Sequence, residues 1–362
     1  MTVSIPLGGF NLSGGVKVLV IVANAMAARG WRVVLVAPDF AATSPFALAP
    51  SVSTRVVRAG PAWLPRPVRK IWYYVKLAGL AARRADLCVA NYYLTAYCAI
   101  VSRRLFSRRT RVVWYVQGDE AVSHGLIADA RPVSRRLRYL AARLSYRLPL
   151  GTVCVSHWVR ERIGKPDAVV CHAPAIDPDV FRVRERAERS ARAVIGTIGR
   201  RGETKGYDTI RAALERLPDP SRVAVVVASP ARGEVELPAG VAAEAVLAHS
   251  EREMAEFYAR CDVFVLPSVM EAFPLPPLEA MACGCAVVTT ACGGVADYAE
   301  DGVNCLVVPV RDAERMAGAI WRLVTDEELR TRLAAQGPKT AQRFERARLA
   351  EELVAAAARV AR

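Results

Sequence analysis

Two cations and two carboxylates in the second half of the chain have the types and spacing of one polar site. Arg200 follows the apolar run AVIGTIG, and Lys205 comes five residues later, where a helical pattern begins. Glu271 follows the run DVFVLPS, and Glu279 comes eight residues after Glu271. Ligands of parallel α/β sheets bind at the carboxyl ends of the strands, so we expect these side chains at one edge of one sheet. Fixed cations there stabilise developing negative charge, and carboxylates accept hydrogen bonds from hydroxyl groups.

The first half contains two weaker groups of polar candidates. Gly14 and Gly15 open a helical pattern, where bare amides can bind an anion, although a glycine pair is also typical of a plain strand-to-helix turn. The sequence QGDE at 117–120 follows the apolar run TRVVWYV. Gln117 can donate or accept a hydrogen bond, whereas Asp119 could orient a substrate hydroxyl or take its proton.

Short apolar runs alternate with helical patterns along the chain, which indicates the elements that position these residues. Continuous apolar strands between helices are typical of a parallel sheet covered on both faces, the doubly wound α/β arrangement. The charged segment DPDVFRVRERAERSAR interrupts the pattern, and 362 residues exceed the roughly 250 to 300 at which single cores stop growing. We therefore predict Rossmann-like domains over 1–185 and 186–340, and a helix over 341–362 that packs back toward the first domain.

Composition excludes several classes of protein. Hydrophobic residues make up 53% of the chain and charged residues 23%, which excludes a disordered chain. Nine cysteines at scattered spacings and four histidines give neither a disulfide framework nor a convincing metal site. No secretory signal and no apolar run of about 20 residues are visible. We expect a cytoplasmic protein with no metal and no cofactor.

The positive charge is concentrated in the first half of the chain. Residues 1–185 contain 27 Lys and Arg against 10 Asp and Glu, a balance of +17, whereas residues 186–362 contain 23 against 25, a balance of −2. Stretches such as RPVRKIWYYVKLAGLAARR interleave arginine with aromatic residues. An anionic membrane surface, nucleic acid and ordinary solvated helices all fit this pattern. The aromatic residues favour the membrane, and no nucleic-acid-binding module accompanies the charge.

The motifs of the second half resemble those of a known family. GTIGRRGETKGYD and LPSVMEAFPLPPLEAMACGCAVVTTACGGVADYAEDGVNCLVV are similar to the donor-binding half of glycosyltransferase family 4, with Glu271 and Glu279 as its E-x7-E pair. LSGGVKVLVIVANAMAARGWRVVLVAP resembles the glycine loop, helix and second strand of the same family. The resemblance implies retaining enzymes of the GT-B fold, in which two Rossmann-like domains face a central cleft.

The resemblance also implies roles for the residues. Arg200 and Lys205 would stabilise the departing nucleotide diphosphate, together with the N-terminal amides and dipole of a helix that begins near Pro276. Glu271 would hold hydroxyls of the donor sugar, and Glu279 would accept from the ribose hydroxyls. The remaining donor-side contacts would come from backbone at Gly14, Gly15, Phe273, Pro274 and Leu275.

Two departures from the family pattern bear on activity. Ala272 and Pro274 stand where the family frequently has glycine, and proline has no amide to donate to the sugar. Gln117 stands where many members have a histidine near the reacting carbon, and glutamine cannot become cationic. Gln117 and Asp119 are therefore our acceptor-side candidates, in a pattern similar to members that build rhamnose-rich or other cell-surface polysaccharides.

These observations together predict a metal-independent retaining glycosyltransferase. The donor would be a nucleotide-diphosphate sugar, and the acceptor a glycan or a lipid-linked saccharide bound by the basic first domain, which would also contact an anionic membrane from the cytoplasmic side. Three alternatives stay open: a sugar-nucleotide-binding protein without turnover, an epimerase of nucleotide sugars, and a protein that binds nucleic acid through its charge.

Overall fold

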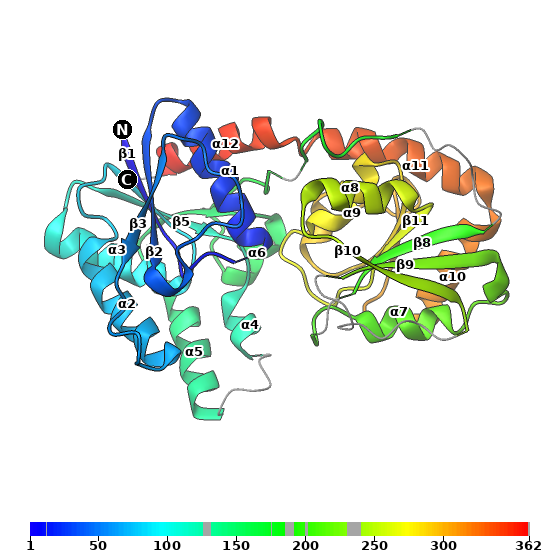
Figure 1. Cartoon of the computed structure of the whole chain (residues 1–362), viewed down its shortest axis with the longest axis horizontal. Coiled ribbons are helices and arrows are strands. Elements are labelled where there is room, and N and C mark those ends of the chain that lie inside the picture. The colour runs from blue at the N-terminus through cyan, green and yellow to red at the C-terminus, as the bar shows by residue number, and fades with distance from the viewer. Residues whose placement is uncertain are drawn as a thin grey trace. The chain divides into compact units, whose positions relative to one another are not determined.

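The chain forms two compact units, which are described separately. The computed structural model describes residues 1–11, 13–125, 132–174, 176–184, 192–199, 202–229 and 240–360. The first unit comprises Met1–Pro174 together with Ala347–Arg362, and the second comprises Ala175–Arg346. Each unit is a parallel sheet with helices on both faces (Figure 1). The predicted fold class, two doubly wound α/β units, is therefore confirmed.

The sheet of the first unit has seven parallel strands in the order β3-β2-β1-β4-β5-β6-β7. Chain order reverses at β1, so the loops after β1 and β4 leave the sheet at its topological switch point. The strands are β1 (Thr2–Pro6), β2 (Arg32–Pro38), β3 (Val52–Val57), β4 (Leu87–Ala90), β5 (Arg111–Val116), β6 (Gly151–Cys154) and β7 (Val169–Val170).

Among the described residues, seven helices belong mainly to this first unit. They are α1 (Gly14–Ala28), α2 (Arg66–Leu80), α3 (Tyr93–Phe106), α4 (Glu120–Gly125), α5 (Pro132–Ser145), α6 (His157–Ile163) and, from the end of the chain, α12 (Arg346–Val360). An ion pair connects Arg29, the residue after α1, to Glu351 of α12. A side chain at Gly151 would place its Cβ 1.8 Å from the carbonyl oxygen of Val360, so only glycine lets β6 begin beside the end of α12.

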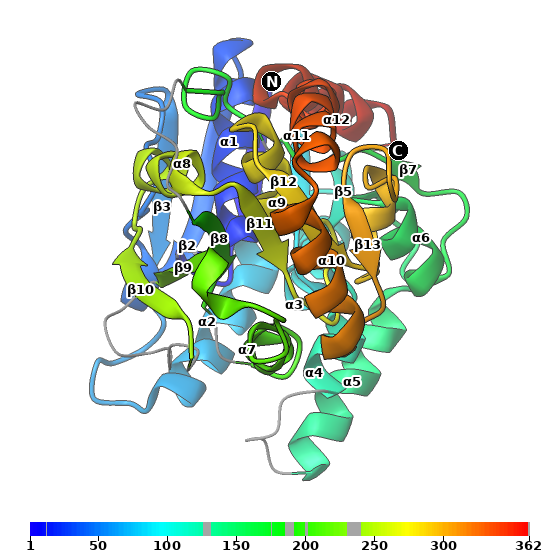
Figure 2. The ribbon, with the colours of Figure 1, turned by 90° about the vertical axis from the view of Figure 1, so that its right-hand side faces the viewer.

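The sheet of the second unit has six parallel strands in the order β10-β9-β8-β11-β12-β13. These are β8 (Ala193–Ile198), β9 (Val223–Ser229), β10 (Ala242–Leu247), β11 (Val263–Leu266), β12 (Ala286–Thr290) and β13 (Leu306–Val308). The helices are α7 (Tyr207–Leu214), α8 (Glu251–Arg260), α9 (Leu275–Ala282), α10 (Ala313–Thr325) and α11 (Glu327–Gln342). Helices α8 and α9 lie on one side of the strands, with α7 and α10 on the other (Figures 1 and 2).

The core of the second unit lies between its central strands and the helices that cover them. Val263 and Val265 of β11 are fully buried, and Met316, Ile320 and Leu323 of α10 recur at helical spacing over the same face of the sheet. Because helices cover both faces, neither face of these strands needs polar residues. The charged candidates of the site lie outside these strands, in the loops after β8 and β11 and on α9.

The end of the chain carries two helices, because α11 ends at Gln342 and α12 begins at Arg346. Helix α12 lies within the range 341–362 over which a helix was predicted. Within the described ranges, no helix combines the length and the hydropathy that crossing a bilayer requires.

Candidate active site

Lys205 and Glu271, two of the four charged residues singled out in the second half, form a direct ion pair. The Lys205 Nζ lies 2.7 Å from Oε1 of Glu271. The hydroxyl of Ser268 donates to the same oxygen at 2.9 Å. Both charged side chains are half-buried, with 33% of Lys205 and 22% of Glu271 exposed. A ligand can therefore reach the pair and take the place of one of its two members.

Backbone contacts between two loops place Lys205 beside Glu271. The amide of Val269, after β11, donates to the carbonyl of Thr204, after β8, at 2.8 Å. Gly206 has a φ of +64°, and a Cβ there would lie 1.9 Å from the carbonyl oxygen of Pro267. A residue with a side chain would force the two loops apart. Gly206 thus permits both the turn and the close approach.

The backbone of Glu271 is held from both sides by the loop that follows β12. Its amide donates to the carbonyl of Cys292 at 2.7 Å, and its carbonyl accepts from the amide of Gly294 at 2.9 Å. A Cβ at Gly294 would lie 1.7 Å from the carbonyl oxygen of Ala272, so glycine is required at this crossing. The carboxylate of Glu271 consequently extends from a fixed backbone, and burial, followed by the charge of Glu271, raises the pKa of the neighbouring Cys292 thiol to about 12.

Glu279 lies deeper in the same unit, on α9. Only 6% of the residue is exposed, and the hydroxyl of Tyr258 donates to its Oε2 at 3.0 Å. Burial and then the Glu279 carboxylate hold the pKa of the Tyr258 hydroxyl far above its ordinary range, so Tyr258 remains a donor. A buried polar group needs a hydrogen-bond partner, and Tyr258 supplies one to Glu279. Sequence patterns alone did not identify Tyr258, which lies 21 residues away.

The start of α9, predicted near Pro276 as a source of N-terminal amides, is rich in proline. The helix begins at Leu275, after Pro274 as the N-cap residue, so Pro276 and Pro277 fall within its first turn. Proline has no N–H, and of the first four helical positions only Leu275 and Leu278 therefore carry an amide hydrogen. The helix dipole remains, but few amide hydrogens accompany it.

Phe273 and Pro274 are fixed by aromatic packing rather than left in a mobile loop. Phe273 is 7% exposed, and its ring lies 5.6 Å from that of Tyr298 and 5.5 Å from that of Phe344. The hydroxyl of Tyr298 donates to the carbonyl of Pro274 at 2.8 Å. The Phe273 side chain thus belongs to the core, which leaves only its backbone available to a ligand.

Arg200, the second predicted cation, lies outside the described residues.

In the first unit, the structure brings the glycine pair and Gln117 together. Ser13 is the N-cap residue of α1, and its hydroxyl accepts from the amide of Val16 at 3.4 Å. Gly14 and Gly15 form the first turn of this helix, and a Cβ at Gly15 would lie 2.9 Å from Oε1 of Gln117. The ends of β1 and β5 thus contribute to one polar edge, as the doubly wound topology requires.

Asp119 is engaged within the protein itself. The residue is 4% exposed, and its Oδ1 accepts from the hydroxyl of Tyr146 at 2.9 Å and from the amide of Val122 at 3.2 Å. Its Oδ2 lies 3.3 Å from Nε of Arg162. These contacts favour a role in holding the loop and the start of α4, and they argue against direct contact with an acceptor.

Glu120, to which the sequence interpretation gave no role, is the residue of this loop whose pKa is strongly shifted. Its Oε2 accepts from the amide of Tyr93, at the start of α3, at 2.7 Å. Burial raises the pKa of Glu120 to about 8, the Tyr93 amide opposes this rise, and the charge of Asp119 adds to it. The loop beside Gln117 therefore carries a carboxyl group that exchanges its proton near neutral pH. No sequence motif signals this, because Tyr93 lies 27 residues away.

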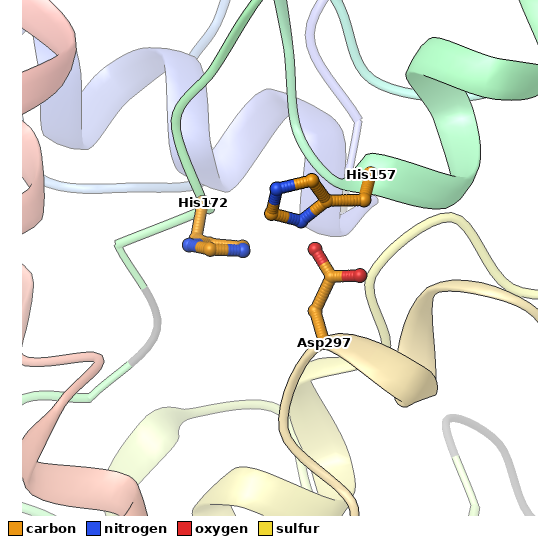
Figure 3. A group of neighbouring side chains, drawn as sticks. All are labelled: His157, His172 and Asp297. Atoms are coloured by element: carbon orange, nitrogen blue, oxygen red, sulfur yellow. The ribbon is translucent and has the colours of Figure 1, made fainter.

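Three potential metal ligands are drawn in Figure 3, but they do not come from one unit. His157 and His172 belong to the first unit, with their ring centroids 5.9 Å apart, and Asp297 ends a short 3₁₀ helix (Gly294–Asp297) of the second. Two imidazoles alone fall short of the three or four protein ligands of zinc sites. The histidine pair is therefore not assigned as a metal site, and metal independence stays a prediction.

The architecture and the polar edges define a class of protein. Two parallel, doubly wound units in one chain match solved GT-B glycosyltransferases. Sucrose-phosphate synthase from Thermosynechococcus elongatus superposes with a TM-score of 0.80 at 19% identity, covering 98% of this chain and 97% of that one. Anabaena HepE, solved in complex with UDP-glucose, superposes with a TM-score of 0.72 at 17% identity, covering 98% of both chains. At such identities the likeness shows the GT-B fold alone.

Sequence comparison assigns the family. The family described as "Glycosyltransferase Family 4" matches residues 12–180, and "Glycosyl transferases group 1" matches residues 181–340. The chain belongs to glycosyltransferase family 4. It is 34% identical to a D-inositol 3-phosphate glycosyltransferase of Stackebrandtia nassauensis over 53% of this chain and 48% of that protein, about half the relative's length. A protein of the same name from Frankia alni is 29% identical over 90% of both chains.

Proposed function

We propose that this glycosyltransferase transfers a sugar, with retention of its anomeric configuration, from a nucleotide-diphosphate sugar to a glycan or lipid-linked saccharide. The observation that carries the proposal is the half-buried Lys205–Glu271 pair, held between the loops after β8, β11 and β12. A cation beside a carboxylate suits a donor that has both phosphate and hydroxyl groups. The products would enter cell-surface polysaccharide or glycoconjugate synthesis.

The donor would be bound through complementary contacts in the second unit. Lys205, joined by Arg200, would contact the diphosphate, and Glu271 would accept hydrogen bonds from sugar hydroxyls. Glu279, oriented by Tyr258, would accept from the ribose. Because Lys205 already lies against Glu271, phosphate binding would replace one anionic partner of the lysine with another.

The transfer step requires no side-chain nucleophile. The bond between the anomeric carbon and the phosphate oxygen breaks as the acceptor hydroxyl oxygen bonds to that carbon from the same face. The hydroxyl proton passes to the departing phosphate oxygen, whose negative charge Lys205 stabilises together with the dipole of α9. Neither a metal nor a cofactor has a step in this scheme.

The first unit would bind the acceptor beside Gln117. This residue can donate to or accept from a hydroxyl, while Asp119 keeps its loop in place. All nine cysteines are buried as thiols, which supports a reducing, cytoplasmic compartment.

The proposal is tested by measuring products from UDP-glucose and from a panel of GDP and dTDP sugars, with and without a lipid extract as acceptor. We expect one donor to release its nucleoside diphosphate in an acceptor-dependent reaction, with the starting anomeric configuration in the NMR spectrum of the product. Lys205→Ala should slow this release by a factor of about 10² to 10³. Lys339→Ala, which alters an exposed lysine on α11, should not slow it. Inversion of configuration would contradict the retaining mechanism. Conversion of the donor sugar without release of nucleotide would identify an epimerase instead.

A further inference from the structure

Helix α2 has a second apolar face that is turned to solvent. Its inner face is fixed by Tyr73 and Leu77, both fully buried. On its outer side, Ile71, Trp72 and Val75 are 64%, 50% and 67% exposed. The spacing of i, i+1 and i+4 keeps these side chains on one face of the helix. Single exposed apolar residues are ordinary, but a continuous stripe indicates a surface that is covered by something else.

Helix α5 presents a longer stripe of the same kind. Val133, Leu137, Leu140 and Leu144 are 72%, 62%, 48% and 53% exposed. Their spacing of i, i+4, i+7 and i+11 corresponds to one face over about three turns. A surface helix of an isolated domain has polar residues at these positions. The inner side of α5 already packs through Ala142 and Ser145, both fully buried.

Helix α3 connects the two stripes. It packs against both α2 and α5, and at its end Leu105 and Phe106 are 68% and 53% exposed. In two perpendicular views α2 and α5 reach the same end of the first unit (Figures 1 and 2). We call the exposed sides of these three helices the α2–α3–α5 face, and all of it belongs to the first unit.

The same face is strongly cationic. Residues 40–85 contain eight Lys and Arg and no acidic residue, residues 87–118 contain five and none, and residues 130–160 contain seven and none. Exposed members on the helices include Lys70, Arg104 and Arg143. Two cations lie over aromatic rings of the face, Lys76 at 6.0 Å from Trp72 and Arg83 at 6.0 Å from Phe106. Aliphatic, aromatic and cationic groups are thus interleaved.

This chemistry favours one kind of partner. We propose that the α2–α3–α5 face docks on an anionic lipid bilayer, with its aliphatic and tryptophan side chains among the lipid headgroups and its arginines and lysines against lipid phosphates. Nucleic acid would bind the cations but would leave the aliphatic stripes exposed. A second copy of this chain would bring like charges together. Docking goes beyond sugar transfer, and its consequence that the bilayer also presents a lipid-linked acceptor rests on the proposed function.

The experiment is co-sedimentation of the full-length protein with vesicles. At low salt we expect most of the protein to bind vesicles that contain 30% phosphatidylglycerol and little to bind phosphatidylcholine alone, because basic segments are attracted to anionic lipid. High salt should weaken the binding, since the charges are exposed. Failure to bind anionic vesicles at low salt would overturn the proposal.

Three variants locate the surface. Leu137→Glu with Leu140→Glu on α5 should lower the bound fraction at least five-fold, and Ile71→Glu with Val75→Glu on α2 should do the same. Val303→Glu, which alters a 52% exposed valine of the second unit, is the matched control and should bind like the parent. Equal melting temperatures would show that the variants are folded. Undiminished binding by both folded double variants would overturn the assignment of this face.

Two further measurements distinguish membrane docking from sugar transfer and from self-association. Lys205→Ala should bind vesicles as well as the parent protein does, so membrane docking and sugar transfer can fail independently. Light scattering tests for a second copy on the face: a dimer that Leu137→Glu with Leu140→Glu dissociates would overturn the membrane assignment. Tight binding of DNA that these glutamates abolish, without vesicle binding, would overturn it in favour of nucleic acid.

Discussion

The two units share a topology but differ in how firmly they hold their polar edges. In the second unit, backbone hydrogen bonds hold Glu271 on both sides. A Cβ atom at Gly206 or at Gly294 would lie less than 2 Å from a backbone carbonyl oxygen. In the first unit, the close approach at Gly15 is to Oε1 of Gln117, the mobile end of a side chain. Two units of the same topology can therefore position a rigid site in one case and an adaptable site in the other, because the loops and not the sheet determine the site.

The two halves of the chain also differ in net charge. Residues 1–185 have a balance of +17 and residues 186–362 a balance of −2. A nearly neutral surface suits a unit that would recognise a small donor through a few fixed groups. A cationic surface with exposed apolar stripes suits contact with an extended anionic partner. Substitutions in the two units should therefore have different consequences.

The largest effect is expected from Lys205→Ala, which removes the cation of the rigid edge. Loss of one group that stabilises a departing anion lowers kcat by about 10² to 10³, so turnover of the donor should fall by that order. Steady-state kinetics would measure it, with Lys339→Ala as the control. A variant that keeps the parent's kcat would show that Lys205 does not serve the reaction.

Gly294→Ala should be the most damaging of the glycine substitutions. Its Cβ would lie 1.7 Å from the Ala272 carbonyl oxygen, so the backbone beside Glu271 must move. Overpacking of this kind destabilises a protein by about 1 to 3 kcal/mol, and we also expect most of the activity to be lost. Gly318→Ala is the control, because Gly318 lies on an exposed turn of α10 with no atom within 4 Å of its Cβ. Equal melting temperatures for both variants would contradict a rigid edge.

Gly15→Ala tests the adaptable edge of the first unit. The new methyl group would press on the amide of Gln117, which can rotate away, so we expect little change in melting temperature. Displacement of Gln117 should weaken acceptor use by roughly ten-fold, as expected for about 1.4 kcal/mol. Kinetics with varied acceptor at saturating donor would measure this. A loss of stability as large as that of Gly294→Ala would contradict the claim that the edge of the first unit is the more adaptable one.

The smallest effect concerns pH and Glu120. Burial raises the pKa of Glu120 from its ordinary value of 4.5 to about 8, so the folded protein keeps a proton that the unfolded chain releases. The stability that this proton provides is present at low pH and is lost as the pH rises from about 4.5 toward 8. Glu120→Gln cannot release a proton, and its melting temperature should therefore fall less than that of the parent over this interval. Parallel melting curves from pH 5 to 8 would contradict the raised pKa.

Local sequence patterns predicted the fold and the placement of the main charged residues. Apolar strands between helices predicted two parallel sheets, and the positions of Lys205 and Glu271 after two strands predicted that they meet. This succeeds because carboxyl ends of parallel strands share an edge wherever the strands occur in the chain.

Details that depend on distant residues could not be predicted in this way. Asp119 is buried by Tyr146 and Arg162, which lie 27 and 43 residues away. The sequence shows that α5 is amphipathic, but only tertiary packing determines which side remains exposed.

The central claim is that the rigid edge of the second unit binds a nucleotide-diphosphate sugar through Lys205, and thermal stabilisation tests it most directly. A ligand that binds only the folded state at 100 times its Kd stabilises it by about 2.7 kcal/mol. Among UDP, GDP, dTDP and their sugars, we predict that one nucleotide raises the melting temperature of the parent and of Lys339→Ala but not that of Lys205→Ala or Glu279→Ala. An equal rise in all four proteins, or no rise with any nucleotide in the folded parent, would contradict the account.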